Sequence, residues 1–493
     1  MAKGYNVLFV TSEVFPYSKT GGLADVSNAL PQALNSLGNE VRIISPKYGP
    51  QDERRLQIHE IKRLKDLTIP INDKPIKFSI KSSFIHGRNT KAQIYLLENN
   101  DYFKNKGIYQ NIKTKKDFAN NDERYLFFCK SVLEILEILQ WKPDVIHCND
   151  WQTGLIPAFI KTYYKRNIHV GDIKTVFTIH NLAYQGNFPK ATFKKTGLPD
   201  TVLSPDGGLF KGQFSYLKTG LSYADKITTV SQKYAEEIRT NKDYSWGMED
   251  VLNRRKRDLS GILNGVDYSL WNPSIDKIIT YRYTHQEIPL KYENKRELVK
   301  RFGLTYKESI PLIGIISRLD DYKGTDLIME ILPKLMKEDI QMIILGVGEE
   351  KYQKFFVSAK KKYPNKLIVN IAFDEELAHH IYAGADMFLM PSRYEPCGLS
   401  QLYSLKYGTV PIIRNTGGLG DTIIDYKKPD GTGFLFNDFK PDALMKIIQT
   451  ATGVFRNNKQ KWHSIMRNGM ALDFSWKVSA KNYMDLYKSL VGK

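Results

Sequence analysis

A Gly-rich turn near the N-terminus, Tyr17–Val26, most constrains what this chain can fold into. It follows a short apolar run, Val7–Val10, typical of a buried parallel strand, and it leads into apolar residues at helical spacing. Gly21 and Gly22 let a ligand approach the backbone, and the free N–H groups of a helix start attract an anion. The pair alone also fits an ordinary strand-to-helix turn, but the cation of Lys19 beside it favours a phosphate site.

A second stretch, Thr416–Asp421, repeats the Thr-Gly-Gly-Leu-x-Asp pattern of Thr20–Asp25. It too follows an apolar run, Val410–Ile413. Two such turns in one chain predict two similar α/β units with phosphate chemistry between them.

The length of 493 residues suits two large domains, and the 42% hydrophobic and 25% charged residues are typical of a globular protein. No apolar run reaches about eighteen residues, so we expect no membrane span. Met1–Asn6 lead almost directly into the first strand, so we expect no signal or transit peptide. Three cysteines without a CxxC motif argue for a reducing, cytoplasmic location and against a zinc site.

The net charge of +19 is compatible with a nucleic-acid or membrane partner. However, the lysines are spread along the chain, the only dense cluster is Arg254–Arg257, and no nucleic-acid motif accompanies it. We therefore expect neither a nucleic-acid nor a membrane partner. A positive surface would also attract an anionic nucleotide substrate.

Strand and helix patterns alternate along both halves of the chain, which predicts an α/β fold with doubly wound, mostly parallel sheets. The pattern restarts near residues 259–267, and a polar stretch, 276–307, follows before the next strong strand. We therefore expect a first domain over 1–262 and a second over 263–473, with a final helix within 474–493.

Polar residues follow several of the predicted strands at their carboxyl ends, where open α/β sheets bind ligands. Asp150 and His180 do so in the first half, and Arg318, Lys323 and Glu395 in the second. Each alone has an ordinary explanation, such as a helix cap or a solvated loop cation. Together they predict a ligand site in each half.

Five motifs, in this order, resemble the bacterial glycogen synthases and plant starch synthases: Lys19–Leu23, Thr178–Asn181, Asn264–Asp267, Ser317–Gly324 and Pro391–Leu399. The resemblance covers essentially the whole chain. It implies the GT-B fold, in which two Rossmann-like domains face a deep cleft. It also implies that the final helix, within 474–493, crosses back to the first domain.

The resemblance assigns roles to the residues at matching motif positions. The catalytic set it implies is Asp150, His180, Arg318, Lys323 and Glu395. The donor-binding set it implies is Lys19, Gly21, Gly22, Asn264, Arg318, Lys323, Phe373, Glu395, Cys397, Gly398, Leu399 and Ser400. In this scheme the cations neutralise the leaving diphosphate, Phe373 lies against the nucleobase, and His180 lies against the transferred glucose.

The implied reaction transfers glucose from ADP-glucose to the non-reducing end of an α-1,4-glucan, with retention of configuration. The implied partners are ADP-glucose and a glycogen- or starch-like polymer, without a metal or other cofactor. Two routes to retention stay open. One is front-face attack, with the leaving phosphate taking the proton. The other is double displacement, with Asp150 or Glu395 as the nucleophile.

The chain departs from related enzymes at Tyr403, where many retaining GT-B enzymes carry a second Glu, eight residues after Glu395. It also shows no long N-terminal extension of the plant type, so we expect the bacterial branch. Two alternatives stay open: another retaining GT-B glycosyltransferase with a different acceptor, and an inactive module that binds glucan or nucleic acid. Neither the oligomeric state nor any allosteric regulation is predicted from the sequence.

Overall fold

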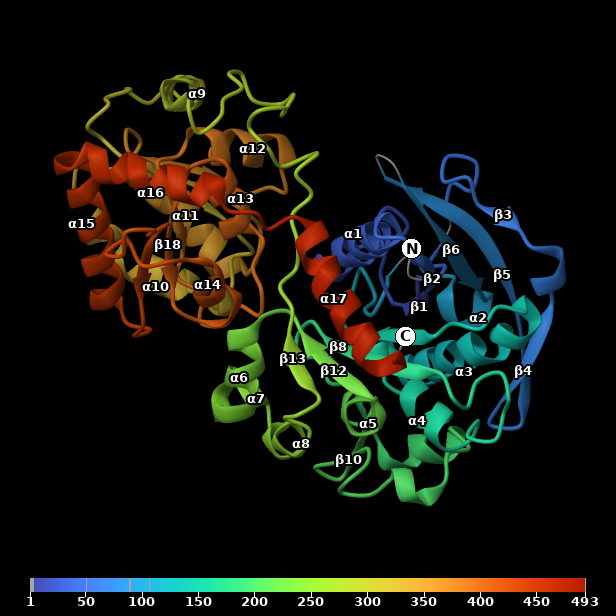
Figure 1. The fold of residues 1–493 in the computed structure, drawn as a ribbon. Coiled ribbons are helices and arrows are strands. Elements are labelled where there is room, and N and C mark those ends of the chain that lie inside the picture. The colour runs from blue at the N-terminus through green and yellow to red at the C-terminus, as the bar shows by residue number, and fades with distance from the viewer. Residues whose placement is uncertain (1–3, 50, 88–89, 106, 493) are drawn as a thin grey trace. The chain divides into compact units, whose positions relative to one another are not determined.

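Two compact units make up the chain in the computed structural model (Figure 1). The first comprises Met1–Val230, Ala235–Gly265 and Trp476–Lys493, and the second comprises Ser231–Tyr234 and Val266–Ser475. The structure describes residues 4–49, 51–87, 90–105 and 107–492. Met1–Lys3, part of the segment expected to lead into the first strand, lie outside the described residues.

The first unit is built on a ten-stranded sheet with the order β13-β12-β8-β7-β1-β2-β6-β5-β3, in which β4 pairs with β5. Its strands are β1 (Asn6–Val10), β2 (Glu40–Pro46), β3 (His59–Glu60), β4 (Leu67–Ile71), β5 (Lys74–His86), β6 (Lys91–Glu98), β7 (Val145–Asn149), β8 (Lys174–Ile179), β12 (Lys226–Thr229) and β13 (Leu259–Gly261). A small separate sheet holds β9 (Asn187–Phe188), β10 (Leu209–Phe210) and β11 (Gln213–Ser215).

All strand pairs from β13 to β6 are parallel, as the alternation of strands and helices predicts. Their central strands are apolar and buried, because helices cover a parallel sheet on both faces. One edge of this mostly parallel sheet is antiparallel, since β5 pairs antiparallel with β3, β4 and β6. Buried side chains alternate along much of β5, which suits an antiparallel strand with one solvated face.

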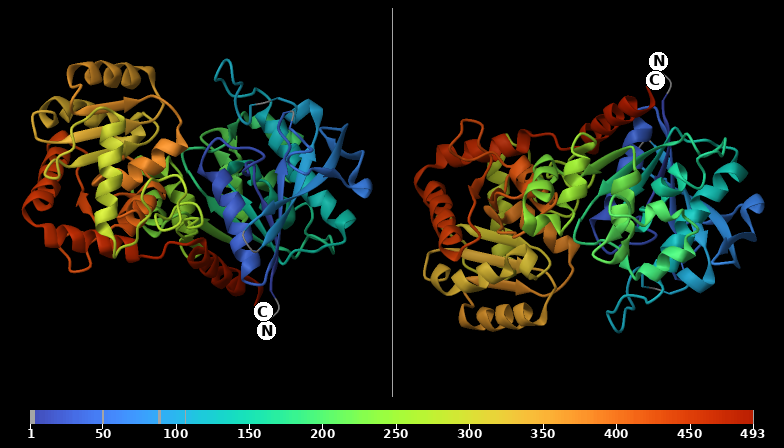
Figure 2. Two further views of the ribbon diagram at one scale, coloured as in Figure 1. Left: turned by 90° about the horizontal axis from the view of Figure 1, so that it is seen from above. Right: turned by 90° about the horizontal axis from the view of Figure 1, so that it is seen from below.

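The helices before residue 265 are α1 (Gly22–Ser36), α2 (Asn100–Phe103), α3 (Asn121–Leu139), α4 (Ile156–Lys161), α5 (Tyr216–Tyr223), α6 (Gln232–Thr240), α7 (Lys242–Ser245) and α8 (Glu249–Arg254). The final helix, α17 (Trp476–Val491), packs against α1, and Figure 2 shows the two side by side. Tyr483 and Tyr487 of α17 share a buried core with Leu30 and Leu34 of α1. The Tyr487 hydroxyl also lies 2.7 Å from Nδ1 of His147 on β7, so α17 is anchored to the sheet.

The second unit is built on a six-stranded parallel sheet with the order β16-β15-β14-β17-β18-β19. Its strands are β14 (Leu312–Ile316), β15 (Gln341–Leu345), β16 (Leu367–Asn370), β17 (Met387–Met390), β18 (Val410–Arg414) and β19 (Phe434–Phe436). Its helices are α9 (Ile288–Arg301), α10 (Thr325–Leu335), α11 (Glu350–Lys362), α12 (Glu375–Gly384), α13 (Ser400–Lys406), α14 (Gly417–Thr422), α15 (Pro441–Asn457) and α16 (Lys459–Ala471).

Helix α9 lies inside the stretch that the sequence analysis treats as a polar connection. Two of its lysines, Lys291 and Lys295, are buried. Lys295 pairs with the buried Asp386 at 2.6 Å, and Lys291 donates to the carbonyls of Tyr382 and Ala383 at the end of α12. Ile288, Leu298 and Val299 of the helix also join the core, but the two buried lysines interrupt the apolar stripe by which a packed helix is usually recognised.

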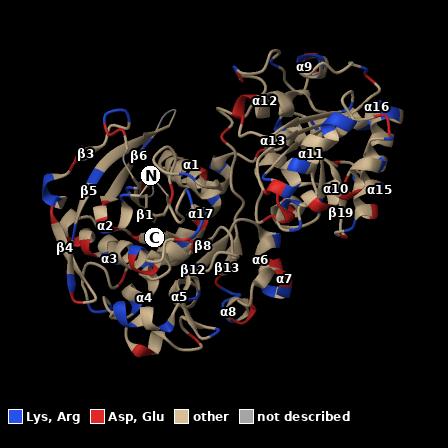
Figure 3. Ribbon diagram, turned by 180° about the vertical axis from the view of Figure 1, so that it is seen from behind, with Lys and Arg blue, Asp and Glu red and all other residues tan. Residues whose placement is uncertain are grey.

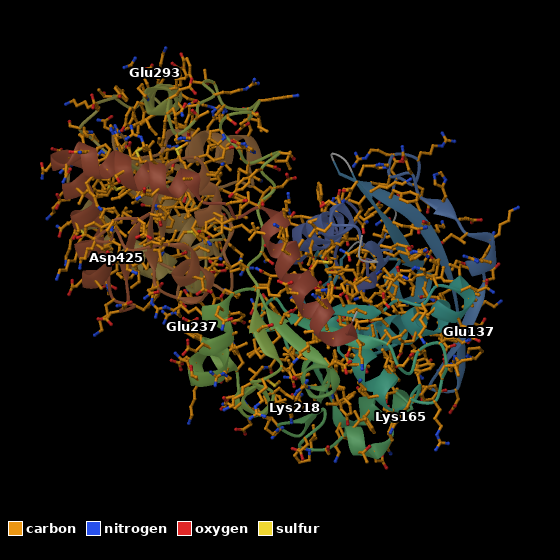
Figure 4. All side chains as sticks on the ribbon, in the orientation of Figure 1. Glu137, Lys165, Lys218, Glu237, Glu293 and Asp425 are labelled. Carbon is orange, nitrogen blue, oxygen red and sulfur yellow. The ribbon has the colours of Figure 1, made fainter. Side chains whose placement is uncertain are left out.

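Lys and Arg residues are distributed over both units (Figure 3). Several perform structural work: in the Arg254–Arg257 cluster, Arg255 donates to the carbonyls of Leu221, Ser222 and Ala224. Lys218, labelled in Figure 4, donates to the carbonyls of Pro205 at 2.6 Å and Leu209 at 2.7 Å. Within the described part of the chain, no helix has the length and apolar character needed to cross a bilayer.

Candidate active site

The turn between β1 and α1 leaves open space beside its glycines. A Cβ atom added to Gly21 or Gly22 would meet no other atom within 4 Å. Gly21 has extended backbone, with φ −153°, and α1 begins at the next residue. A ligand can therefore approach the backbone of this turn closely.

Glu13 occupies the position at which the sequence analysis expects an external anion. Its buried carboxylate accepts hydrogen bonds from the Thr20 hydroxyl at 2.6 Å, from the Gly21 N–H at 3.2 Å and from the Thr20 N–H. The hydroxyl of Tyr109 donates to it at 2.6 Å. In this structure the chain itself therefore supplies the anion at the turn.

Sequence reasoning misses both of these residues. Glu13 lies three residues beyond the end of β1, so the strand-end criterion that selects Asp150 would also have found it. Tyr109 arrives on a long loop and carries no local signal. Burial and the Glu13 carboxylate raise the pKa of Tyr109 well above its usual value, so this hydroxyl stays protonated and acts as a donor.

Lys19 is held beside the turn. Its ammonium pairs with Asp25 at 2.7 Å and lies 5.6 Å from the centre of the Phe15 ring. The side chain is 41% exposed, so water weakens the ion pair. The cation therefore remains accessible to an anionic ligand at the turn.

Asp150 and His180, predicted from two separate strand ends, are in direct contact. β7 and β8 are parallel neighbours, and Asp150 Oδ1 accepts the His180 N–H at 2.8 Å. Asp150 has φ +55° and ψ −179°, a backbone conformation that is otherwise almost restricted to glycine, so the backbone of this residue is strained. Burial raises the pKa of Asp150 to about 7 and lowers the pKa of His180 to about 3.

Asn149 determines which ring nitrogen of His180 carries the proton. The Asn149 amide nitrogen donates to the Val10 carbonyl at 2.9 Å, so its oxygen is left to accept. That oxygen lies 2.9 Å from Nε2 of His180. Neutral His180 therefore carries its proton on Nε2 and presents Nδ1 as an acceptor.

Asn264 lies beyond β13, and its buried side-chain oxygen has no hydrogen-bond partner among the described residues. The next residue, Gly265, packs against the start of α17, where a Cβ would lie 2.5 Å from the Trp476 backbone. No hydrogen bond between described residues joins Asn264 to Asp150 or His180. The structure thus positions Asn264 but does not tie it to that pair.

In the second unit, Lys323 and Glu395 form an ion pair. The Lys323 ammonium lies 2.6 Å from Oε2 of Glu395, which also accepts from the Ser392 hydroxyl at 3.2 Å. Gly324 makes this approach possible: it has φ +69°, and a Cβ there would lie 2.2 Å from the Pro391 carbonyl oxygen. Only glycine fits so close to that backbone.

Asp320 contacts both of the cationic residues that follow β14, Arg318 and Lys323. Its Oδ2 pairs with Nε of Arg318 at 2.5 Å, and its Oδ1 accepts the Lys323 N–H at 3.0 Å. The Arg318 side chain is 61% exposed, whereas that of Lys323 is 27% exposed. One buried carboxylate thus shapes the loop that presents the two positive charges.

The second Gly pair, Gly417 and Gly418, differs from the first. A Cβ on Gly417 would lie 2.0 Å from the carbonyl oxygen of Glu395, and one on Gly418 would lie 2.1 Å from that of Cys397. The chain's own backbone therefore covers these glycines, in contrast to the open space beside Gly21 and Gly22. The repeat instead supports the loop that carries Glu395.

The remaining predicted donor residues lie in the same unit. Cys397 is buried, whereas Gly398, Leu399 and Ser400 are partly exposed. Phe373 follows β16 and, at 86% exposure, is the most exposed large apolar side chain in the described part of the chain. No aromatic ring among the described residues contacts it, so its faces are accessible.

No group of three or more His, Cys, Asp or Glu side chains at metal-binding distances occurs among the described residues. The two units instead present cations and hydrogen-bonding groups: Lys19, Asp150 and His180 in the first, and Arg318, Lys323 and Glu395 in the second. Such groups suit the binding of an anionic sugar compound.

Comparison with known proteins identifies the family. The starch synthase catalytic domain model matches residues 6–254, and the model of glycosyl transferases group 1 matches residues 298–452. A glycogen synthase of Moorella thermoacetica is 43% identical over 495 residues, covering 100% of this chain and 98% of the relative. A glycogen synthase of Thermotoga maritima is 42% identical over 491 residues, covering 99% of both chains.

Among solved structures, the catalytic domain of starch synthase IV from Arabidopsis thaliana, bound to ADP and acarbose, superposes with a TM-score of 0.88. It is 29% identical, and the match covers 100% of both chains. The predicted GT-B fold is therefore confirmed. The chain belongs to the family of glycogen and starch synthases, which are glycosyltransferases.

Proposed function

We propose that this protein is a glycogen synthase that transfers glucose from ADP-glucose to the non-reducing end of an α-1,4-glucan, with retention of configuration. The observation that carries the proposal is the contact between Lys323 and Glu395. It combines, at one point, a cation for a departing phosphate and a carboxylate for sugar hydroxyls. Relatives named glycogen synthase, more than 40% identical over essentially the full length, support it.

Charge is the main chemical problem of this reaction. As the bond from the anomeric carbon to the phosphate oxygen breaks, the diphosphate gains negative charge, and preorganised cations lower the barrier. Arg318 and Lys323 stabilise that charge, and Asp320 fixes the loop that holds both. We assign the same task to Lys19 in the first unit, where the turn glycines leave room for a phosphate. On this proposal no metal or other cofactor is required.

The sugar hydroxyls are held by side chains that accept hydrogen bonds. His180 stays neutral above pH 5, because burial lowers its pKa to about 3, and its Nδ1 accepts a hydroxyl hydrogen. Glu395, in contact with Lys323, accepts hydrogen bonds from sugar or ribose hydroxyls. An adenine base stacks on the exposed ring of Phe373.

The choice of donor rests on the starch synthase IV structure, which was solved with bound ADP. Retention follows either from front-face attack, with the leaving phosphate as base, or from double displacement through Asp150 or Glu395. We propose a cytoplasmic location, since the structure describes Cys129, Cys148 and Cys397 as buried thiols rather than disulfides.

The test is turnover by the purified protein. ADP-glucose and UDP-glucose are supplied at equal concentration with glycogen, with short α-1,4-glucans or with monosaccharide acceptors, and released nucleotide is measured. We expect ADP release that depends on glucan, and new α-1,4 linkages by NMR. The Glu395→Gln variant serves as the low-activity control. A clear preference for UDP-glucose, transfer only to small acceptors, or no turnover would each contradict the proposal.

A further inference from the structure

Gln401 is a buried side chain to which neither the sequence motifs nor the proposed mechanism assigns a role. It is completely buried on the first turn of α13, directly beneath the loop Cys397–Ser400. Its amide nitrogen lies 3.1 Å from the carbonyl oxygen of Cys397, 3.0 Å from that of Gly398 and 3.3 Å from the Thr422 hydroxyl oxygen. Carbonyl oxygens only accept, so the geometry fixes which end of the amide is the donor.

The other end of the same amide is left without a partner. Oε1 of Gln401 is buried and accepts no hydrogen bond in the described part of the chain. A Cβ added to Gly398 would lie 2.4 Å from this oxygen, so the amide fills the space under that residue. A buried polar oxygen without a partner costs free energy, so the favourable contacts of this amide are those of its nitrogen.

The hydrogen bonds from Gln401 to the Cys397 and Gly398 carbonyls also determine where the N–H groups of the same two peptide units point. In a trans peptide unit the N–H points away from the C=O. Because the Cys397 and Gly398 carbonyls point inward to Gln401, the N–H groups of Gly398 and Leu399 point outward. Neither N–H donates a hydrogen bond within the residues that the structure describes. Gly398 has φ +73° and both residues are partly exposed, an arrangement in which successive N–H groups can bind an anion.

The neighbouring carbonyls are restrained by a different element. Those of Glu395 and Pro396 both lie 3.2 Å from the N–H of Gly418 on α14. Thr422 connects the two restraints, since its hydroxyl donates to the Gly418 carbonyl at 2.7 Å and lies beside the Gln401 amide. Four successive carbonyls, those of residues 395–398, thus accept hydrogen bonds from buried donors, two from Gly418 and two from Gln401.

We propose that Gln401 is a positioning residue for the donor site: it holds two loop carbonyls inward and so aims the N–H groups of Gly398 and Leu399 at a phosphate oxygen of the donor. The proposal rests on the proposed function, because the loop's role in binding the donor comes from it. Gln401 itself touches no substrate. It acts through the backbone.

Gln401→Met is the first test, because methionine keeps the length and fills the space but removes every donor. ADP binding to the full chain is measured by calorimetry, and KM and kcat are measured for ADP-glucose and for glycogen. We expect ADP affinity to fall about tenfold to a hundredfold, the loss expected for hydrogen bonds to a charged group. KM for ADP-glucose should rise, while KM for glycogen stays unchanged. ADP affinity equal to that of the wild type would overturn the proposal.

Thr422→Val is the matched control. This substitution removes the buried Thr422 hydroxyl, the third hydrogen-bond partner of the Gln401 amide. The hydrogen bonds from Gln401 to the Cys397 and Gly398 carbonyls remain. The variant's loss of thermal stability should resemble that of Gln401→Met, while its ADP affinity stays at the wild-type level. An equal loss of ADP affinity in Thr422→Val would show a merely structural effect and overturn the assignment.

Gln401→Glu keeps the proposal testable if Gln401→Met fails to fold. A buried glutamic acid is neutral at low pH and then has one O–H donor for the loop, whereas its carboxylate has none. ADP affinity of this variant, relative to the wild type, should therefore recover as the pH falls; a ratio independent of pH would contradict the proposal. Failure of wild-type turnover with ADP-glucose would instead remove the proposed function, so the two failures are distinguishable.

Discussion

The ammonium of Lys323 lies 2.6 Å from a carboxylate oxygen of Glu395, although the two residues are 72 positions apart in the chain. Gly324 brings them together, because its φ of +69° and missing side chain let the Lys323 loop press against the Pro391 carbonyl. Each residue alone follows a strand end, which is a weak signal. Their contact turns two separate candidates into one charged site.

Replacing Lys323 with alanine should lower kcat/KM for ADP-glucose about 10²- to 10³-fold, the usual cost of losing one preorganised charge contact. The fold should persist, since the side chain is partly exposed and on a loop. Lys354→Ala is the matched control, because it removes a lysine of the same unit whose partner, Glu350, is an exposed residue of the same helix. A Lys323→Ala enzyme as active as Lys354→Ala would contradict the role of that loop.

The two Gly pairs should respond in opposite ways to an added methyl group. Gly21→Ala should leave the melting temperature unchanged, because its backbone is extended and the new Cβ enters open space, but it should weaken ADP-glucose binding. Gly418→Ala should lower the melting temperature, because its Cβ would lie 2.1 Å from the Cys397 carbonyl oxygen. Calorimetric scans of both variants decide the point. Equal melting temperatures would mean that the contrast between the pairs is wrong.

Glu13→Gln should destabilise the first unit by about 1–3 kcal/mol, the cost of mispaired buried polar groups. The Thr20 N–H, the Gly21 N–H and the Tyr109 hydroxyl all donate to the carboxylate, and an amide group would direct its own N–H bonds at some of these donors. Tyr109→Phe, which removes a single donor, should cost less. Thermal unfolding of the three proteins tests the order wild type, Tyr109→Phe, Glu13→Gln.

The raised pKa of Asp150 predicts that the free energy of unfolding depends on pH. Burial raises its pKa to about 7 from an ordinary value of 3.8, so the folded state binds its proton more tightly than the unfolded state does. The contribution of Asp150 to stability is therefore fully present at acidic pH below 3.8 and is lost as the pH rises to about 7.

Asp150→Asn removes this titration while keeping an oxygen for the His180 N–H. Relative to the wild type, the variant should gain stability steadily between pH 4 and pH 7 and change little above that. Melting temperatures across this range check the slope. A difference between the two proteins that does not depend on pH would show that Asp150 is ionised throughout.

Chelation should not abolish activity. We expect the leaving diphosphate to be neutralised by Lys19, Arg318 and Lys323, so that EDTA leaves turnover intact. Assays in EDTA, with and without added Mg²⁺ or Mn²⁺, measure this directly. Activity that disappears in EDTA and returns with a divalent ion would show that a metal shares the charge.

The sequence alone determined the local units of this protein. Strand, turn and helix can be read from apolar periodicity and glycines over about ten residues, so the Gly21–Gly22 turn, the ends of β7 and β8 and the loop after β14 were all predictable. Residue patterns also carried the family resemblance, because the groups that handle a donor must recur in a particular order. The parallel sheets followed from the alternation of these units.

Only the tertiary structure decided which polar side chains become hydrogen-bond or ion-pair partners. Glu13 accepts hydrogen bonds from the turn before α1, Tyr109 reaches Glu13 from a distant loop, and Gln401 restrains the loop beside Glu395. Helix α9 likewise escaped prediction, because Lys295 is satisfied by Asp386, 91 residues later in the sequence. A buried polar group takes its partner from wherever the fold supplies one, and no local pattern encodes that partner.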